Sequence, residues 1–152
     1  MIRVQEGPFD PGVELAGLKT GAAAAGATVM FVGTVREMSD GRAIAAMTLE
    51  HYPAMTERAL AEIEAEARRR WPLDTVLMIH RYGRLEPGED IVLVITRSAH
   101  RQAAFESCAF LIDWLKTKAP FWKLEADAKG ERWVEARGSD EEAAQRWSRG
   151  EA

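Results

Sequence analysis

The stretch SAHRQAAFESCAFLIDWLKTKAPFWK, residues 98–123, decides the fold because it predicts one long helix with a sharp end. Four apolar residues recur along it at three- and four-residue steps: Phe105, Cys108, Ile112 and Leu115. This spacing is typical of a helix that packs one face on a core. We expect the helix to run from about residue 100 to residue 118, because Pro120 cannot continue it. Cationic residues stand at both ends, which suits an anionic small molecule held by several donors.

On both sides of this helix, strand-like and helix-like segments alternate without the regularity of βαβ repeats. The predicted strands are residues 2–5, 44–52, 75–80 and 91–96, a buried strand at 27–35, and a hairpin of 121–126 and 132–136. The predicted helices are residues 10–18 and 53–70, the second with Met55, Leu60, Ile63 and Ala67 on one face. We therefore expect an α+β fold: a single domain over residues 1–137, with an antiparallel or mixed sheet packed against helices and a small C-terminal hairpin. Residues 138–152 are polar and predict a tail or a short helix.

The composition excludes several classes of protein. Twenty Lys and Arg against 24 Asp and Glu give a net charge of −4, whereas a nucleic-acid binder usually carries a basic excess. The longest uncharged stretch, residues 20–35, is shorter than the ~20 residues of a membrane span, and the N-terminus lacks a signal pattern. Cys108 is the only cysteine, so we expect a buried, inert thiol rather than a disulfide or a Cys-rich metal site. A cytoplasmic protein is expected.

His100 and Arg101 follow an apolar strand at the predicted start of the long helix. Free backbone N–H groups and the helix dipole favour an anion at this position, and Arg101 can add a bidentate contact to phosphate. Arg is disfavoured by the dipole at a helix start, so its presence favours a ligand over an ordinary solvated first turn. Arg36 ends another strand just before a flexible loop, a usual place for a ligand contact.

Lys116 and Lys123 flank the far end of the helix, with Ala119 and Pro120 reversing the chain between them. Ammonium groups held together repel, which favours a neutral amine that can act as base, acid or nucleophile. The alternative is ordinary capping of the helix C-terminus, the role expected of Lys118. His51 and His80 lie inside strands without metal-ligand spacing, so both are interpreted as structural and no metal site is expected.

The two cationic ends are too far apart for one small substrate. His100 and Lys116 are separated by about 24 Å along a helix that rises 1.5 Å per residue. Either one end alone is catalytic, or two copies of the chain bring opposite helix ends together. A twofold dimer would do this twice, with one shared site in each half.

The sequence resembles the large, catalytic subunit of molybdopterin synthase over nearly its whole length. The resemblance rests on FVGTVR (31–36), LEHYPAMTERAL (49–60), SAHRQAAFE (98–106), LKTKAPFWKLE (115–125) and RWVEA (132–136), and on residues 70–94. The combination of T-V-R, A-H-R and K-x-x-x-P-x-W-K in this order is specific, whereas any one of them alone is weak.

The resemblance implies an α/β hammerhead-type fold and a central homodimer within a heterotetramer. A small ubiquitin-like subunit binds at each outer end, and its Gly-Gly C-terminus enters the pocket as a thiocarboxylate. Two sulfur transfers then convert a cyclic pyranopterin monophosphate into the dithiolene of molybdopterin. The resemblance implies neither a metal nor a cofactor for this step.

The resemblance also assigns residues. Lys116 and Lys123 correspond to the catalytic lysines, while Arg36, His100 and Arg101 correspond to the substrate pocket, the last two from the neighbouring copy. Further residues expected along the substrate are Thr34, Val35, Leu124 and Glu125, with Arg137 at its phosphate.

Two other functions stay open from the residues alone. One is a non-catalytic dimeric scaffold whose cationic cluster captures a ubiquitin-like C-terminal tail. The other is a different enzyme that acts on a phosphorylated heterocycle without sulfur chemistry.

Overall fold

The computed structural model describes residues 1–19, 25–39, 41–134 and 138–148. Its helices are α1 (Pro11–Leu18), α2 (Pro53–Arg70), α3 (Arg101–Lys118) and α4 (Gly138–Ser148). Its strands are β1 (Ile2–Gln5), β2 (Ala27–Thr34), β3 (Met38–Ser39), β4 (Arg42–Ala43), β5 (Ala46–His51), β6 (Leu73–Arg81), β7 (Gly83–Leu85), β8 (Asp90–Ser98), β9 (Phe121–Asp127) and β10 (Gly130–Val134). The expected α+β single domain is confirmed.

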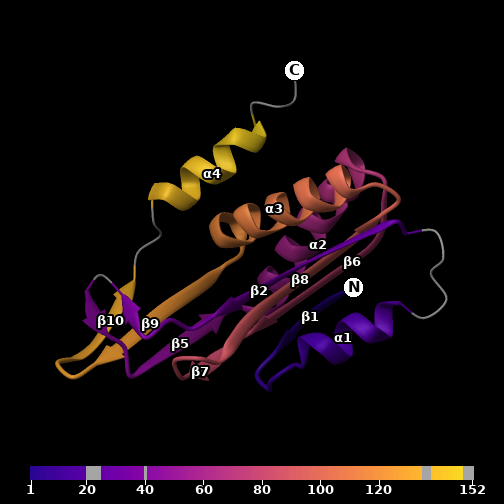
Figure 1. Cartoon of the computed structure of the whole chain (residues 1–152). Helices are drawn as coiled ribbons and strands as arrows, with labels where there is room; N and C mark the ends of the chain where they lie inside the picture. The colour runs from indigo at the N-terminus through magenta and orange to yellow at the C-terminus, as the bar shows by residue number, and fades with distance from the viewer. Residues whose placement is uncertain (20–24, 40, 135–137, 149–152) are drawn as a thin grey trace.

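The main sheet has the order β1-β6-β8-β2, with β8 antiparallel to both of its neighbours and β1 parallel to β6. Helices α2 and α3 cover one face of this sheet and α1 covers the other (Figure 1). Strands β6 and β8 carry runs of consecutive apolar residues and are buried for most of their length. Because alternate residues of a strand point to opposite faces, both faces of these strands are apolar. The sheet is therefore the central layer of the domain.

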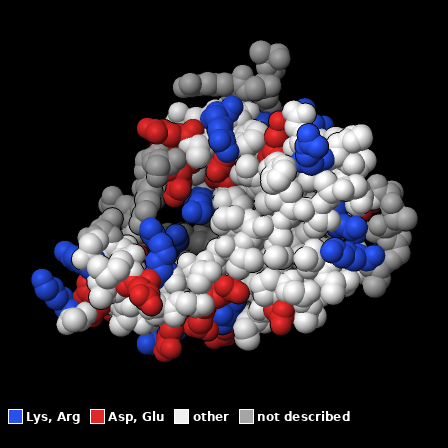
Figure 2. Space-filling model, viewed as in Figure 1, with Lys and Arg blue, Asp and Glu red and all other residues white. Residues whose placement is uncertain are grey.

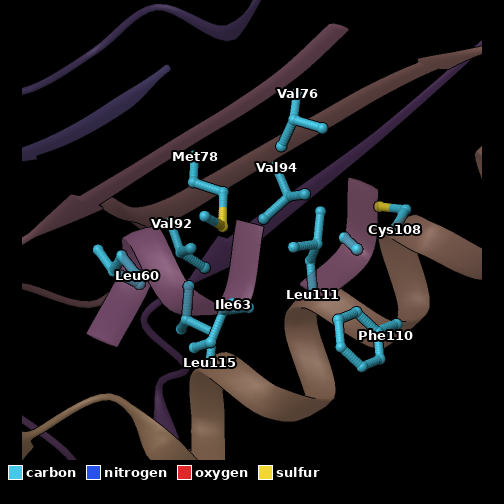
Figure 3. Packing of buried hydrophobic residues seen from close by; sticks show 11 residues of the cluster. Leu60, Ile63, Val76, Met78, Val92, Val94, Cys108, Phe110, Leu111 and Leu115 are labelled. Carbon is cyan, nitrogen blue, oxygen red and sulfur yellow. The ribbon is translucent and has the colours of Figure 1, made fainter. Parts of the chain in front are cut away.

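The larger core lies between the sheet and the two long helices (Figure 3). Leu60 and Ile63 of α2 and Leu111 of α3 pack there against Met78 and Val94 of the sheet. Each of these side chains is at most 2% exposed. Burial of such a side chain stabilises the fold by roughly 1.5–3 kcal/mol, so this layer holds the helices in place.

The predicted core faces of both long helices were wrong at one position each. Phe105 is 62% exposed and Met55 is 59% exposed, although their spacing matched the apolar stripe. In α3 the buried face is instead built on Ala104, Cys108, Leu111 and Leu115. Phe105 follows Ala104 directly, so it is turned by about 100° from this face.

A second, smaller sheet has the order β10-β9-β5-β7. The predicted C-terminal hairpin is present as β9 and β10, and its turn uses Gly130 at φ +129°, a conformation that other residues adopt only with strain. Strand β5 pairs antiparallel with both β9 and β7. Strand β7 was not predicted, because three residues that include a glycine carry almost no periodic signal.

The strand predicted as buried at residues 27–35 is β2, which lies at the edge of the main sheet. It is only half-buried, and Met30 is 41% exposed, so the prediction of a buried strand was wrong. After β2, the short strands β3 and β4 pair with each other. They bracket the predicted turn at residues 39–41, of which Asp40 lies outside the described residues.

Candidate functional site

The two cationic clusters lie at opposite ends of one continuous helix, as the sequence predicted. His100 is the N-cap of α3 and Arg101 is its first residue, and both side chains are exposed. The His100 side chain makes no capping hydrogen bond, so the free N–H groups of this helix end are not occupied by it. This end of α3 can therefore accept an anionic ligand.

At the other end of α3, the exposed Lys116 lies in the last helical turn. The Nζ atom of Lys118 lies 3.7 Å from the centroid of the Trp114 ring, a cation–π contact that occupies this amine. Ala119 ends the helix in an extended conformation, and its carbonyl accepts a hydrogen bond from the N–H of Phe121 at 2.9 Å. Four residues thus separate Lys116 from the start of β9.

Strand β9 carries Lys123, Leu124 and Glu125. Lys123 lies opposite Leu49 of β5, and its side chain is exposed. Glu125 is buried and accepts a hydrogen bond from Nη2 of Arg132 at 3.4 Å. Side chains alternate along a strand, so Lys123 and Glu125 share one face of the small sheet while Leu124 points to the other.

Thr34, Val35 and Arg36 lie at the C-terminal end of β2. Thr34 donates its hydroxyl to Oδ1 of Asp90 at 3.0 Å, and the backbone of the buried Val35 pairs with Glu89 and Gly88. Arg36 is exposed. Because β2 pairs antiparallel with β8, and α3 runs back along β8, the end of β2 lies at the same end of the domain as Lys116.

One group of predicted site residues therefore lies at the same end of the domain: Thr34, Val35, Arg36, Lys116, Lys123 and Glu125. Leu124 belongs to the same strand as Lys123 but points to the opposite face of the small sheet. Figure 2 shows Lys and Arg side chains at the rim of a hollow beside the small sheet, near the C-terminal end of α3. His100 and Arg101 are not part of this group, since they lie at the far end of α3. Arg137 lies outside the described residues. A cationic hollow of this kind can bind anions and stabilise negative charge that develops during a reaction.

Sequence reasoning missed an aromatic cluster around Phe121, two residues before Lys123 on β9. The ring of His80 stacks on that of Phe121, with 3.8 Å between centroids and 15° between planes. His51 lies 5.6 Å from Phe121 and 4.5 Å from Tyr82, centroid to centroid. His80 and Phe121 are far apart in sequence and on different sheets, so no sequence spacing links them. The one available signal was a histidine within the apolar run of β6.

His80 is uncharged at neutral pH. Burial lowers its pKa to about 4, and the nearby positive charge of Lys123 adds to this, although the hydrogen bond to the Arg81 carbonyl opposes it. The carbonyl can only accept, so Nδ1 of His80 carries the proton and donates it over 2.7 Å. Burial also lowers the pKa of His51, partly offset by Glu57.

The other reactive side chains in the described residues are not arranged as a catalytic or metal-binding site. Cys108 is buried and free, and burial raises the pKa of its thiol to about 11, so the thiol stays protonated. Within the described ranges, no three His, Cys, Asp or Glu side chains are grouped so that they could hold a metal ion. The helices in these ranges are all too short or too polar to cross a membrane.

Comparison with protein families matches residues 4–118 to the family described as MoaE protein. The molybdopterin synthase catalytic subunit of Pseudomonas aeruginosa is 60% identical over 146 residues, which cover 96% of this chain and 97% of that protein. Among solved structures, the molybdopterin biosynthesis MoaE protein from Burkholderia ambifaria is similar with a TM-score of 0.83 and 51% identity over 97% of both chains. A complex of subunits 1 and 2 of molybdopterin-converting factor from Helicobacter pylori has a TM-score of 0.74 at 22% identity, covering 90% of this chain and 91% of that one, a likeness of fold alone.

Proposed function

The chain belongs to the MoaE protein family, and from this premise we propose that it is the catalytic subunit of a molybdopterin synthase. It takes two sulfur atoms from the thiocarboxylated C-terminus of a small ubiquitin-like subunit. It inserts them into a cyclic pyranopterin monophosphate to form the dithiolene of molybdopterin, in the cytoplasm. The observation that carries this proposal is the 60% identity to the Pseudomonas aeruginosa catalytic subunit along 96% of the chain.

The proposed reaction develops negative charge at two places: on the departing phosphate oxygen, and on the acyl oxygen when water attacks the acyl–sulfur bond. The thiocarboxylate sulfur of one small subunit attacks a carbon of the pterin side chain, and the phosphate oxygen bonded to that carbon departs. At the neighbouring carbon a second thiocarboxylate sulfur replaces the carbon's own oxygen, which leaves as water. Water then cleaves the bond between the acyl carbon and sulfur, which leaves sulfur on the substrate and a carboxylate on the small subunit. Cationic groups fixed beside the reacting atoms lower the barrier to such steps.

Lys116 and Lys123 are the proposed catalytic residues. Both side chains are exposed, and the two residues lie on either side of the chain reversal at Pro120. Lys116 is held by helix α3 and Lys123 by the paired strand β9. Lys116 lies beside the entering thiocarboxylate in this proposal, and Lys123 stabilises the departing phosphate oxygen. Either amine can also move a proton while the acyl–sulfur bond is hydrolysed.

The remaining proposed residues bind the substrate. Arg36 holds its phosphate together with Arg137, whereas Thr34, Val35, Leu124 and Glu125 line the pterin. His100 and Arg101 complete the pocket from a second copy of the chain, since α3 keeps them about 24 Å from Lys116 within one copy. The proposed assembly is a central homodimer with one small subunit at each outer end, a heterotetramer. The two-subunit complex from Helicobacter pylori is a precedent of the same fold.

Reconstitution tests this function directly. The purified chain is incubated with the pterin precursor and the thiocarboxylated small subunit, and mass spectrometry follows the pterin. We expect a product with two added sulfur atoms and a small subunit that ends in carboxylate. Binding of the tail without any change of the pterin would indicate the scaffold alternative. Conversion of the pterin without sulfur would indicate a different enzyme of phosphorylated heterocycles.

A further inference from the structure

The small sheet and the main sheet are joined by a stack of rings next to Lys123, made by His51, His80 and Phe121. His51 lies opposite Phe121, and Leu49 lies opposite Lys123, in the antiparallel register of β5 and β9. Residues that face each other across two strands point to the same side of a sheet. The Phe121 ring and the Lys123 side chain therefore leave the same face, two positions apart on β9.

The ring that packs on Phe121 comes from the main sheet. His80 of β6 is 7% exposed and stacks on Phe121 with ring centroids 3.8 Å apart. Its Nδ1–H is held by the Arg81 carbonyl at 2.7 Å, which sets the orientation of the ring. Phe121 is also the first residue of β9, where the chain leaves the reversal after α3. A shift of the Phe121 ring would thus move the start of the strand that carries Lys123.

We propose that His80 is a positioning residue for Lys123: its ring, stacked on Phe121, fixes the start of β9 and thereby the place from which the Lys123 amine reaches the substrate. This inference rests on the proposed role of Lys123 in sulfur transfer. The charge state of His80 is consistent with it, since burial keeps the imidazole neutral and His80 then adds no positive charge beside the Lys123 ammonium. His80 itself does not touch the substrate in this proposal.

Three variants distinguish the effect of losing the His80 ring from the effects of losing its hydrogen bond and of losing stability in general. His80→Leu fills the site with an apolar side chain but removes the planar ring, whereas His80→Phe keeps a neutral, slightly larger planar ring and removes the hydrogen bond to Arg81. Met78→Ala is the matched control, because Met78 lies on the same face of β6, is fully buried and packs in the core instead of against Phe121. All are compared at a temperature at which each variant is folded by circular dichroism.

The kinetic test is a double-mutant cycle with Lys123→Ala, measured as sulfur transfer by the reconstituted complex. We expect His80→Leu to lower kcat by about 10²-fold with little change in KM, since a misplacement of about 1 Å has this cost. His80→Phe should recover most of the loss. In the Lys123→Ala background, His80→Leu should lower the residual kcat no further. Equal losses in both backgrounds, or a loss in Met78→Ala as large as in His80→Leu, overturn the proposal.

A second measurement does not depend on turnover. The ¹³Cε resonance of Lys123 is assigned by its loss in Lys123→Ala and followed by NMR in each variant. We expect it to shift in His80→Leu and to stay in place in Met78→Ala, and an unchanged resonance in His80→Leu overturns the proposal. The two ideas fail differently: wild-type turnover by Lys123→Ala would refute the catalytic role, whereas loss of turnover in Lys123→Ala with normal turnover in His80→Leu would refute only the role of His80.

Discussion

The indole Nε1–H of Trp147 donates a hydrogen bond to Oδ2 of Asp113 at 2.7 Å, which ties α4 to α3 one helical turn before Lys116. Arg146 donates to the same oxygen at 2.8 Å. The Trp147 ring packs edge-on against Trp71 and Phe110, each 5.6 Å away between centroids. The C-terminal helix is therefore seated on the two long helices by one aromatic anchor.

Trp147→Ala is expected to lower the free energy of unfolding by about 2 kcal/mol, because it removes both the ring contacts and a half-buried hydrogen bond. Arg146→Ala is the comparison: the Arg146 side chain is 58% exposed, and its contacts with Asp113 and with the face of the Trp147 ring together contribute about 1 kcal/mol. Urea denaturation followed by circular dichroism measures both. Equal effects of the two substitutions would contradict the role of Trp147 as the anchor.

Leu111→Ala and Phe105→Ala form a second pair on α3. Leu111 is fully buried, so its truncation is expected to cost about 2–5 kcal/mol of unfolding free energy. Phe105 is 62% exposed, so its truncation should change stability by less than about 0.5 kcal/mol. Thermal denaturation of both variants at one protein concentration provides the comparison. A large loss for Phe105→Ala would mean that this side chain is covered in the assembled protein.

The fold could be predicted where local chemistry determines it. Asp10 accepts hydrogen bonds from the N–H groups of Gly12 and Val13 at the start of α1, so that predicted helix start is correct. Pro120 likewise lies just beyond the end of α3. Periodicity failed at Phe105, because a spacing of three or four residues fits two neighbouring stripes of a helix equally well. Only the sheet that packs on α3 decides between them.

The candidate site was predictable in part for a similar reason. Lys116, Lys123 and Arg36 stand beside helix and strand ends, where the sequence carries clear signals. The contact of His80 with Phe121 depends on how two separate sheets meet. The apolar pattern around His80 was enough to place it correctly in a strand. No pattern in the sequence links His80 to Phe121, so this contact could not be predicted.

Stability is expected to fall on acidification below pH 6.5 because of His80. The unfolded chain binds a proton at the ordinary pKa of 6.5, whereas the folded protein binds it only near pH 4. The stabilisation by neutral His80 is complete above pH 6.5 and is lost as the pH falls toward 4, in total about 3 kcal/mol. Urea denaturation between pH 7 and about pH 5 should therefore show a steeper loss for the wild type than for His80→Phe. His51 adds a loss of the same sign to both proteins, and parallel curves would contradict the assignment to His80.

Lys116→Ala is expected to lower sulfur transfer by at least about 10²-fold, the cost of removing one group that stabilises a developing anion. Lys118→Ala is the matched control two residues away, since its amine lies over the Trp114 ring instead. Product is measured by mass spectrometry of the pterin, and binding of the small subunit by calorimetry. Both variants should bind the small subunit normally. Near-wild-type turnover by Lys116→Ala would refute its catalytic role.

Mixing two inactive variants tests whether each site is built from two copies of the chain. Lys116→Ala and Arg101→Ala damage opposite ends of α3, so a shared site places both defects in one half of a mixed dimer and leaves the other half intact. Random exchange makes half of the dimers mixed, and one site in two then works, which predicts about a quarter of wild-type turnover. The variants are unfolded and refolded together, and each alone under the same conditions is the control. Within a single chain α3 keeps Arg101 and Lys116 apart, so a mixture no more active than its components would mean that Arg101 is not needed at the site of its partner.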